Sequence, residues 1–238
     1  MRINCPILSV ELYKPDIRRL LLSVPEDEFT GFKAGQYLEM VLPQKNFPFS
    51  IANSPHITGT IELHVKPTPD SEDSNVIEQF LDTADNIEVE IPLGDCFIES
   101  TPDQTLVLLA ASTGITQMKS IFEYLVHLGH KMPVFLYWGV LAAKDLYLDD
   151  LCRSWKQSFP NLHYIPVVSE PETSPDWSGR TGLVGEAVLE DFDDLTDLIV
   201  YISGGPGMVY ANFNAFVDRG MPEQNMFSDV FTYSPRQE

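Results

Sequence analysis

The chain of 238 residues carries 15 Lys and Arg against 35 Asp and Glu, so its formal net charge at pH 7 is −20. Such a field repels a phosphate backbone and an anionic membrane surface, which argues against nucleic acid and membrane as partners. The apolar fraction of 44% is that of a globular chain with a substantial core.

Cysteine spacing and hydropathy narrow the class of protein further. Cys5, Cys96 and Cys152 lie far apart, whereas a ferredoxin-type iron–sulfur cluster needs four closely spaced thiolates. The histidines share no metal-binding spacing, and no apolar run approaches the roughly 18 residues of a membrane helix. The start of the chain also lacks the unbroken apolar stretch of a signal peptide. We therefore expect a cytoplasmic protein without a bound metal.

The first part of the chain reads as a succession of β-strands. Its apolar residues recur with a period of two, in short runs that Gly and Pro residues close. Apolar residues gathered on one face of 76–81 predict a single helix. Short antiparallel strands with one helix suggest a closed β-barrel. The expected strands are 6–12, 17–23, 36–42, 49–53, 59–65 and 87–91.

One stretch of this part combines aromatic rings, a hydroxyl and an extended backbone. Its backbone groups could bind the edge of a flat heteroaromatic ring, and the Ser50 hydroxyl could donate or accept at a ring nitrogen. An ordinary edge strand with a surface serine explains the same residues, and this stretch alone favours that simpler interpretation. The candidate ring-binding residues are Phe47, Pro48, Phe49, Ser50, Ile51 and Ala52.

In the second part of the chain, strands alternate with helices. The continuous apolar run at 106–110 is typical of a strand buried on both faces, and a helical pattern follows it. This alternation predicts βαβ units around a parallel sheet. The polar stretch at 99–104 marks a boundary between domains at 1–101 and 102–238. Further strands are expected at 134–138, 162–168, 198–203 and 225–231, with helices at 148–158, 183–189 and 208–217.

Two turns follow strands of this predicted sheet, where α/β proteins bind ligands. The first has small residues that would let backbone N–H groups at a helix start approach a pyrophosphate. It lacks the G-x-G-x-x-G pattern, and a tight turn with Thr116 as helix cap explains it equally. Its residues are Ser112, Thr113, Gly114, Ile115 and Thr116.

The second turn is richer in glycine. Three of its four positions from 204 to 207 are Gly, whereas a structural turn rarely needs more than one. A ligand lying against bare backbone accounts better for this composition. The candidate residues are Ser203, Gly204, Gly205, Pro206 and Met208.

A series of short motifs runs through nearly the whole chain in a fixed order. They are FKAGQY at 32–37, PFSIA at 48–52, IELH at 61–64, IPLG at 91–94, TG at 113–114, YWG at 137–139, LY at 146–147, GRTG at 179–182, SG at 203–204 and FSDVF at 227–231. Each is weak by itself. In this order across two domains, the sequence resembles the bacterial NAD(P)H–flavin reductases of the ferredoxin–NADP reductase superfamily.

The resemblance implies a flavin-binding antiparallel β-barrel of Greek-key type, followed by an α/β domain that binds NADH or NADPH. It implies that the residues from Pro48 to Ile51 border the isoalloxazine ring, with Ser50 as catalytic residue near N5, the hydride acceptor. The turns at 112–116 and 203–208 would hold the nicotinamide cofactor, and Phe231 would lie by the ring. Catalysis would then consist of aligning the reactants and excluding water.

Three departures from the family pattern bear on cofactor choice. Phe47 stands where the superfamily usually has Arg, residues 140–143 carry no cation, and Ser203 and Gly205 replace a Cys and a Pro. A flavin phosphate and the 2′-phosphate of NADPH both call for cationic side chains. We therefore expect the flavin (riboflavin, FMN or FAD) to be a dissociable substrate and NADH to be preferred.

Three functions follow from this sequence. The leading hypothesis is an oxidoreductase that reduces riboflavin or FMN with NADH and releases it to a monooxygenase or another acceptor. The first alternative is an electron-transfer subunit that keeps its flavin and docks to an oxygenase. The second is a non-catalytic binding module on the same fold.

Overall fold

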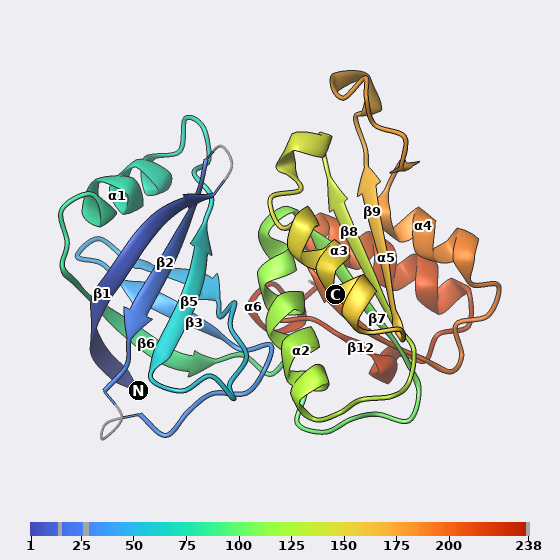
Figure 1. Ribbon diagram of the computed structural model, residues 1–238, viewed down its shortest axis with the longest axis horizontal. Coiled ribbons are helices and arrows are strands. Elements are labelled where there is room, and N and C mark those ends of the chain that lie inside the picture. Colours follow the sequence, from blue (N-terminus) through green and yellow to red (C-terminus); the bar gives the residue numbers. More distant parts are fainter. Residues whose placement is uncertain (14–15, 26–28, 237–238) are drawn as a thin grey trace.

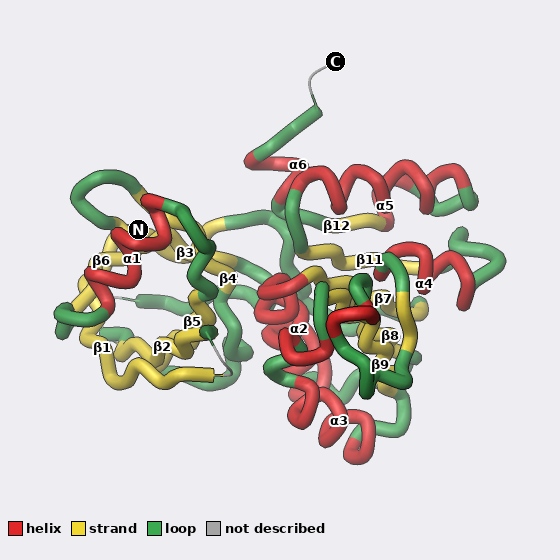
Figure 2. Tube along the Cα trace, turned by 90° about the horizontal axis from the view of Figure 1, so that it is seen from above, coloured by secondary structure: helices red, strands yellow, loops and turns green. Residues whose placement is uncertain are grey.

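The computed structural model describes residues 1–13, 16–25 and 29–236 of the chain. Its elements form two parts that lie side by side, each built on a sheet of six strands (Figure 1). Helix α2 (Ile115–His127) lies where the two parts meet (Figures 1 and 2). Within the described ranges, no helix has the length and apolar character needed to cross a membrane.

The first part is the expected antiparallel barrel. Every strand pairs antiparallel with its neighbours in the order β4-β3-β6-β1-β2-β5. The backbone N–H of Ala52, just after β4, donates to the Glu62 carbonyl on β5 at 2.8 Å and so joins the two ends of this order. The strands are β1 (Arg2–Tyr13), β2 (Ile17–Ser23), β3 (Tyr37–Val41), β4 (Asn46–Ser50), β5 (Thr60–Val65) and β6 (Asn86–Leu93).

The period of two in the sequence corresponds to one buried face on these strands. Alternate residues of β2 and β3, such as Leu20, Leu22 and Leu38, point into the barrel and are wholly buried. Helix α1 (Glu72–Leu81) begins four residues before the expected helix, because Ser71 caps it and accepts a hydrogen bond from the Ser74 N–H. The first turn of this helix is polar, so the spacing of apolar residues in the sequence does not reveal it.

Strand β4 differs from its prediction. It begins at Asn46 and ends at Ser50, because its register with β3 runs from Val41↔Asn46 to Tyr37↔Ser50. Pro48 is tolerated there because β4 ends the strand order as an edge strand. After Ser50 the pairing with β3 ends, and the Ala52 N–H donates a hydrogen bond to Glu62 on β5. The strand expected at 49–53 is therefore shifted toward the N-terminus.

The second part is the expected parallel sheet, with strand order β10-β9-β8-β7-β11-β12. Helices α2 and α3 pack on one face of the sheet, and α4 and α5 pack on the other (Figure 2). The elements not yet named are β7 (Thr105–Ala111), β8 (Val134–Val140), α3 (Asp149–Ser158), β9 (Leu162–Val168), β10 (Arg180–Thr181), α4 (Val184–Asp191), β11 (Leu198–Ser203), α5 (Pro206–Asp218), β12 (Met226–Phe227) and α6 (Val230–Tyr233).

The end of the chain corrects one expectation. A strand was expected at 225–231, but only Met226 and Phe227 pair with β11, and the short helix α6 follows. The cause is a tertiary contact. The Asp229 carboxylate accepts hydrogen bonds from the Cys96 N–H and the Gln117 amide, so the chain turns away from the sheet at this point.

Helix α2 joins the two parts. Its residues from Ile115 to Phe122 are all buried, because one side faces the sheet and the other faces the barrel. The Gln117 side chain donates to the Gly35 carbonyl at 2.6 Å, and the Ser120 hydroxyl donates to the Asn53 carbonyl at 2.7 Å. The polar side chains of α2 thus bind backbone of the barrel.

Candidate functional site

A cavity of about 270 Å³ lies where the barrel and the α/β part meet. Its walls come from β3, β4, α2, the β11–α5 turn and the segment around α6, so residues far apart in sequence line one space. The lining residues are Tyr37, Glu39, Pro48, Phe49, Ser50, Gln117, Ser203, Gly204, Ser228, Asp229, Val230 and Tyr233.

The barrel wall of this cavity contains part of the predicted ring-binding segment. Pro48, Phe49 and Ser50 line the cavity. In the described part of the chain, the Ser50 hydroxyl has no hydrogen-bond partner, so it remains available to a ligand. The aromatic ring of Tyr37, the β3 partner of Ser50, lies on the same wall.

The other three residues of that segment face elsewhere. Phe47 is buried in the barrel core, and Ile51 and Ala52 are wholly buried. Successive side chains of a strand point to opposite faces, and the chain after β4 turns inward to close the barrel. The structure therefore separates the predicted segment into cavity-lining residues and core residues.

The β7–α2 turn contributes mostly packing. A Cβ at Gly114 would lie 2.3 Å from the Ser203 carbonyl oxygen, so glycine is required for the two turns to approach each other. Ile115 is wholly buried in the core, and the buried Thr116 hydroxyl donates to the Thr113 carbonyl at 2.8 Å. Of the five predicted residues, Ser112 lines a cavity, the larger one described below.

The glycines of the β11–α5 turn have free space around them, unlike Gly114 of the β7–α2 turn. A Cβ at Gly205 or Gly207 would meet no atom within 4 Å, and neither residue has a positive φ. Packing and backbone conformation therefore leave these two glycines unexplained. Pro206 begins α5, while Ser203 and Gly204 line the interdomain cavity and Met208 lines the larger one.

The larger cavity, of about 550 Å³, lies beyond the carboxyl ends of the sheet strands. Glu186 is its charged lining residue in the described part of the chain, and no Lys or Arg is among that lining. The guanidinium of Arg180 is paired with Glu190 and Asp191, and that of Arg153 with Asp149. The lining residues are Ala111, Ser112, Gly139, Val140, Leu141, Ser169, Gly182, Leu183, Val184, Gly185, Glu186, Leu189, Met208, Ala211, Asn212 and Ala215.

Residue 204 lies between the two cavities. A Cβ at Gly204 would lie 3.1 Å from the Met208 sulfur and 3.2 Å from the Ala111 Cβ, and both residues line the larger cavity. Gly204 itself lines the smaller one. One extended ligand could therefore run from the larger cavity past this turn toward a second ligand beside Ser50.

The C-terminal segment supplies a titratable group that the sequence did not single out. Burial raises the pKa of the Asp229 carboxyl to about 6, although hydrogen bonds from the Cys96 N–H and Gln117 oppose the shift. Gly94, with a φ of +91°, makes room for this carboxylate and for the Tyr37 ring. The local signals of this arrangement were the glycine that closes the IPLG motif and the Asp229 position within the FSDVF motif.

The structure also distinguishes the two C-terminal aromatic residues. Phe231 packs against the rings of Tyr210 and Phe213 on α5, and it is not among the lining residues of the cavity. Tyr233, two residues later, is 59% exposed and does line it. Two residues correspond to roughly half a helical turn, so α6 directs the two side chains into different surroundings.

The geometry places an antiparallel barrel against a parallel sheet with a cavity between them, and comparison with known proteins identifies the class of protein. The model of the oxidoreductase FAD-binding domain matches residues 4–98, and that of the oxidoreductase NAD-binding domain matches residues 108–212. The chain belongs to the NAD(P)H–flavin reductase family within the ferredoxin–NADP reductase superfamily, as its motifs predicted. Flavin and NAD(P)H are its cofactors.

Individual relatives show how far this similarity extends. The NAD(P)H-flavin reductase of Aliivibrio fischeri is 34% identical over 240 residues, which cover 98% of this chain and 100% of that protein. CDP-6-deoxy-L-threo-D-glycero-4-hexulose-3-dehydrase reductase of Yersinia pestis is 36% identical over 230 residues, 97% of this chain and 69% of that protein. The crystal structure of the Amycolatopsis cytochrome P450 reductase GcoB superposes with a TM-score of 0.87 at 28% identity, covering 96% of this chain and 69% of that chain.

Proposed function

We propose that this protein uses NADH to reduce riboflavin or FMN, which it binds as a dissociable substrate. We assign residues 1–101 to the flavin-binding domain and residues 102–238 to the nicotinamide-binding domain. The observation that carries the proposal is the meeting of the Ser50 wall and the open β11–α5 turn across one interdomain cavity. We also propose a cytoplasmic location and an acceptor of reduced flavin, such as a monooxygenase, as the partner.

The residues present suit both ligands. A flat ring system fits a cavity lined by Tyr37, Phe49 and Tyr233, with the unpartnered Ser50 hydroxyl at its edge. A dinucleotide suits the larger cavity, which lies beyond the carboxyl ends of the strands and extends to Met208 in the first turn of α5. Gly205 and Gly207, outside its lining, leave open space at the start of the same helix. When bound, the nicotinamide supplies a hydride and flavin N5 accepts it.

The contribution of the chain to this reaction is orientation. Ser50 offers a hydroxyl that can donate a hydrogen bond to a ring nitrogen as charge develops there. Gly204 and Gly205 let the nicotinamide end approach the cavity without a side chain in between. Closure of the shared cavity by both ligands excludes water. Positioning of this kind accounts for much of the rate in reactions where the cofactors carry the chemistry.

Loose flavin binding follows from the charges on the barrel. Phe47 supplies no cation because it is buried in the core. Lys45, just before β4, is paired with Asp73 in the first turn of α1. The residues around that helix start, Asp70, Glu72 and Asp73, are acidic, so a flavin phosphate would gain little there. Riboflavin and FMN should therefore bind comparably.

A second candidate function is electron transfer to a docked oxygenase by a protein that keeps its flavin. Its support is the similarity to the cytochrome P450 reductase GcoB, of which this chain spans 69%. The flavin reductase of Aliivibrio fischeri is instead covered over its whole length, which favours reduction of free flavin.

The spectrum and the kinetics of the purified protein test the proposal. We expect a nearly colourless protein that oxidises NADH only when riboflavin or FMN is added, with similar kcat/KM for the two flavins. Recovery of one tightly bound FAD per chain would support the electron-transfer function instead. A folded protein that oxidises no NADH with either flavin would contradict both functions and leave the non-catalytic binding module.

A further inference from the structure

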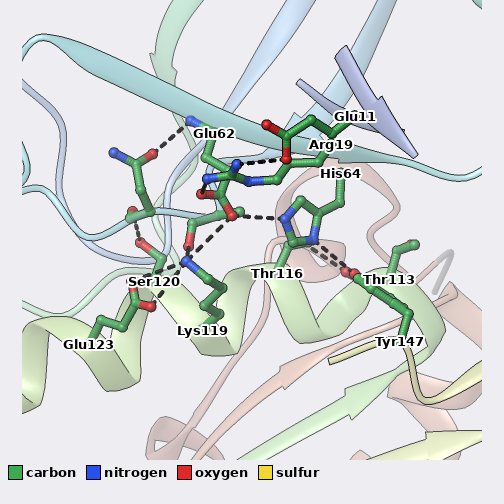
Figure 3. Close-up of polar contacts among 12 residues, drawn as sticks. Glu11, Arg19, Glu62, His64, Thr113, Thr116, Lys119, Ser120, Glu123 and Tyr147 are labelled. Carbon is green, nitrogen blue, oxygen red and sulfur yellow. Dashed lines mark hydrogen bonds and ion pairs between the residues drawn. The ribbon is translucent and has the colours of Figure 1, made fainter. Parts of the chain in front are cut away.

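A group of buried charges lies beside the cavity, outside the residues that line it. Glu62 on β5, His64 on β5 and Lys119 on α2 are 7%, 4% and 7% exposed. Figure 3 shows their side chains meeting between the barrel strands and helix α2, with Arg19 and Glu123 at either side. Charged side chains are rarely buried to this degree unless they are paired, so the contacts of each are informative.

Glu62 is the centre of the group. Its carboxylate accepts hydrogen bonds from Arg19 at 2.9 Å and from His64 Nε2 at 2.8 Å, and Lys119 Nζ lies 3.5 Å away. Burial by itself raises the pKa of Glu62, but these three partners outweigh burial and hold the pKa well below its usual range. Glu62 is therefore ionised throughout the neutral pH range.

His64 connects this carboxylate to the second domain. Burial lowers the pKa of the imidazole despite the hydrogen bond to Glu62, so the ring is neutral near pH 7. Since Nε2 donates to Glu62, Nδ1 is the acceptor of the neutral ring, and the Tyr147 hydroxyl donates to it at 3.0 Å. Tyr147 is partly buried and belongs to the loop before α3 in the second part of the chain, so this contact crosses the domain interface.

Lys119 ties α2 to the chain that follows Ser50. Its ammonium group donates to the Ala52 carbonyl at 3.1 Å and to the Glu123 carboxylate at 3.0 Å. The N–H of the same Ala52 donates to the Glu62 carbonyl at 2.8 Å. The Ala52 carbonyl, two residues after Ser50, is therefore held by the Lys119 side chain, and the Ala52 N–H by the backbone of Glu62.

The same helix also reaches the cavity. Gln117 lines the cavity two residues before Lys119 and binds the Gly35 carbonyl and Asp229. At the start of the helix, Gly114 packs against Ser203 of the opposite wall. Helix α2 thus connects the Ala52 anchor on the barrel to the turn that faces Ser50.

Stability alone is a poor reason for burying these charges. Removing two charges from water costs about as much as their attraction returns, and well-packed apolar residues often serve stability as well or better. Directed hydrogen bonds fix orientation, which apolar contacts do not. Hydride transfer is sensitive to orientation, since a misplacement of about 1 Å can cost about a hundredfold in rate.

We propose that Glu62 and Lys119 are positioning residues for hydride transfer, which set the place of Ser50 relative to the β11–α5 turn through Ala52 and helix α2. This inference rests on the proposed function. Neither residue lines the cavity, so both act through the backbone that they hold.

The test is a double variant, Glu62→Gln with Lys119→Met, which removes both charges together. Arg19 keeps its ion pair with Glu11, whereas Glu123 loses its ion pair with Lys119. The control is Arg18→Met with Glu78→Gln, which removes the Arg18–Glu78 ion pair of 2.7 Å between β2 and α1, together with the ion pair of Arg18 to the exposed Asp82, away from the lining of the cavity. Each protein is examined by single-turnover hydride transfer from NADH to riboflavin, by riboflavin and NADH affinity, and by amide hydrogen exchange without ligands.

The double variant should transfer hydride at least about tenfold more slowly, with both affinities changed by less than about threefold. Its amides at 51–53 should exchange faster, and the control should change neither measurement. An unchanged transfer rate in the folded double variant would overturn the inference. A slower rate with unchanged exchange at 51–53 would overturn it too, because the effect would not pass through this segment.

Two further measurements keep the outcomes distinct. If the wild-type protein oxidises no NADH with either flavin, the proposed function fails, and the positioning inference for hydride transfer falls with it. If the double variant does not fold, the single variant Lys119→Arg replaces it in the test. This substitution keeps the positive charge but moves the N–H donors away from the Ala52 carbonyl. That variant should show slower transfer and faster exchange at 51–53, and unchanged values of both would overturn the inference.

Discussion

The two turns that face each other in this protein look alike in sequence and differ in structure. Gly114 in the β7–α2 turn is explained by packing, because a side chain there would strike the Ser203 backbone. Gly205 in the β11–α5 turn has open space around it and an ordinary backbone conformation. A glycine that packing does not require is better evidence of a ligand than a glycine that it does require.

The same division applies around the whole cavity. Phe47, Ile115 and Thr116 belong to the packed group, whereas Ser50 and Glu186 line cavities. Substitutions in the packed group should change the free energy of unfolding, and substitutions in the open group should change turnover or affinity. The predictions below, ordered from the largest expected effect to the smallest, test this division.

Gly114→Ala should have the largest effect. The new Cβ would lie 2.3 Å from the Ser203 carbonyl oxygen, so the cost should reach the upper end of the roughly 1–3 kcal/mol seen for overpacked sites. For a chain of this size that corresponds to a fall in melting temperature of roughly 6–12 °C. Calorimetry measures it, and an unchanged melting temperature would move Gly114 out of the packed group.

Asp229 lies on the border of the two groups, since it holds Gln117 and also lines the cavity. Its pKa is raised by burial from 3.8 to about 6, so the folded state binds more protons between these values. Stability should therefore fall as the pH rises from about 4 to about 6, by about 2–3 kcal/mol. Urea denaturation should show that Asp229→Asn lacks this loss; the same pH dependence in both proteins would exclude Asp229 as its source.

Ser50→Ala tests the open group directly. A hydrogen bond that strengthens in the transition state is worth roughly 1–3 kcal/mol, or about tenfold to hundredfold in kcat. The KM for flavin should change little, and the melting temperature should stay close to that of the wild type. Stopped-flow measurement under conditions where hydride transfer limits turnover decides the point. An unchanged kcat there would remove Ser50 from the reaction.

Gly205→Val is the counterpart of Gly114→Ala. The added side chain enters open space, so the free energy of unfolding should change by less than about 0.5 kcal/mol. The same side chain would occupy room that we assign to NADH, and the KM for NADH should rise about tenfold while the flavin KM stays constant. A Gly205→Val protein that is destabilised but has a normal KM for NADH would show that Gly205 belongs to the packed group and not to the open group.

Glu186 should produce the smallest effect. It is the charged residue of the larger cavity in the described part of the chain, and it should disfavour the 2′-phosphate of NADPH. Glu186→Gln should narrow the preference in kcat/KM for NADH over NADPH by about threefold. The control Asp193→Asn removes an exposed charge outside that lining and should leave the preference unchanged. If both variants narrow the preference for NADH equally, the overall negative charge of the protein would account for the effect, and the position of Glu186 would not.

The sequence by itself determined the architecture and the family. Local periods place the strands at 17–23, 162–168 and 198–203 at the residues where the structure has them. Period two and period 3.6 arise from the geometry of the local backbone, so a short window of sequence carries them. The ordered motifs that identify the family are also readable without coordinates.

Only the tertiary structure decided which residues of each motif face the cavity. The position of β4 depends on its register with β3, and the end of the last strand depends on a contact between Asp229 and Gln117. The buried pairing of Glu62 with Lys119 likewise joins residues on different domains. Such contacts have no local period, because they depend on how surfaces far apart in the sequence meet in the folded chain.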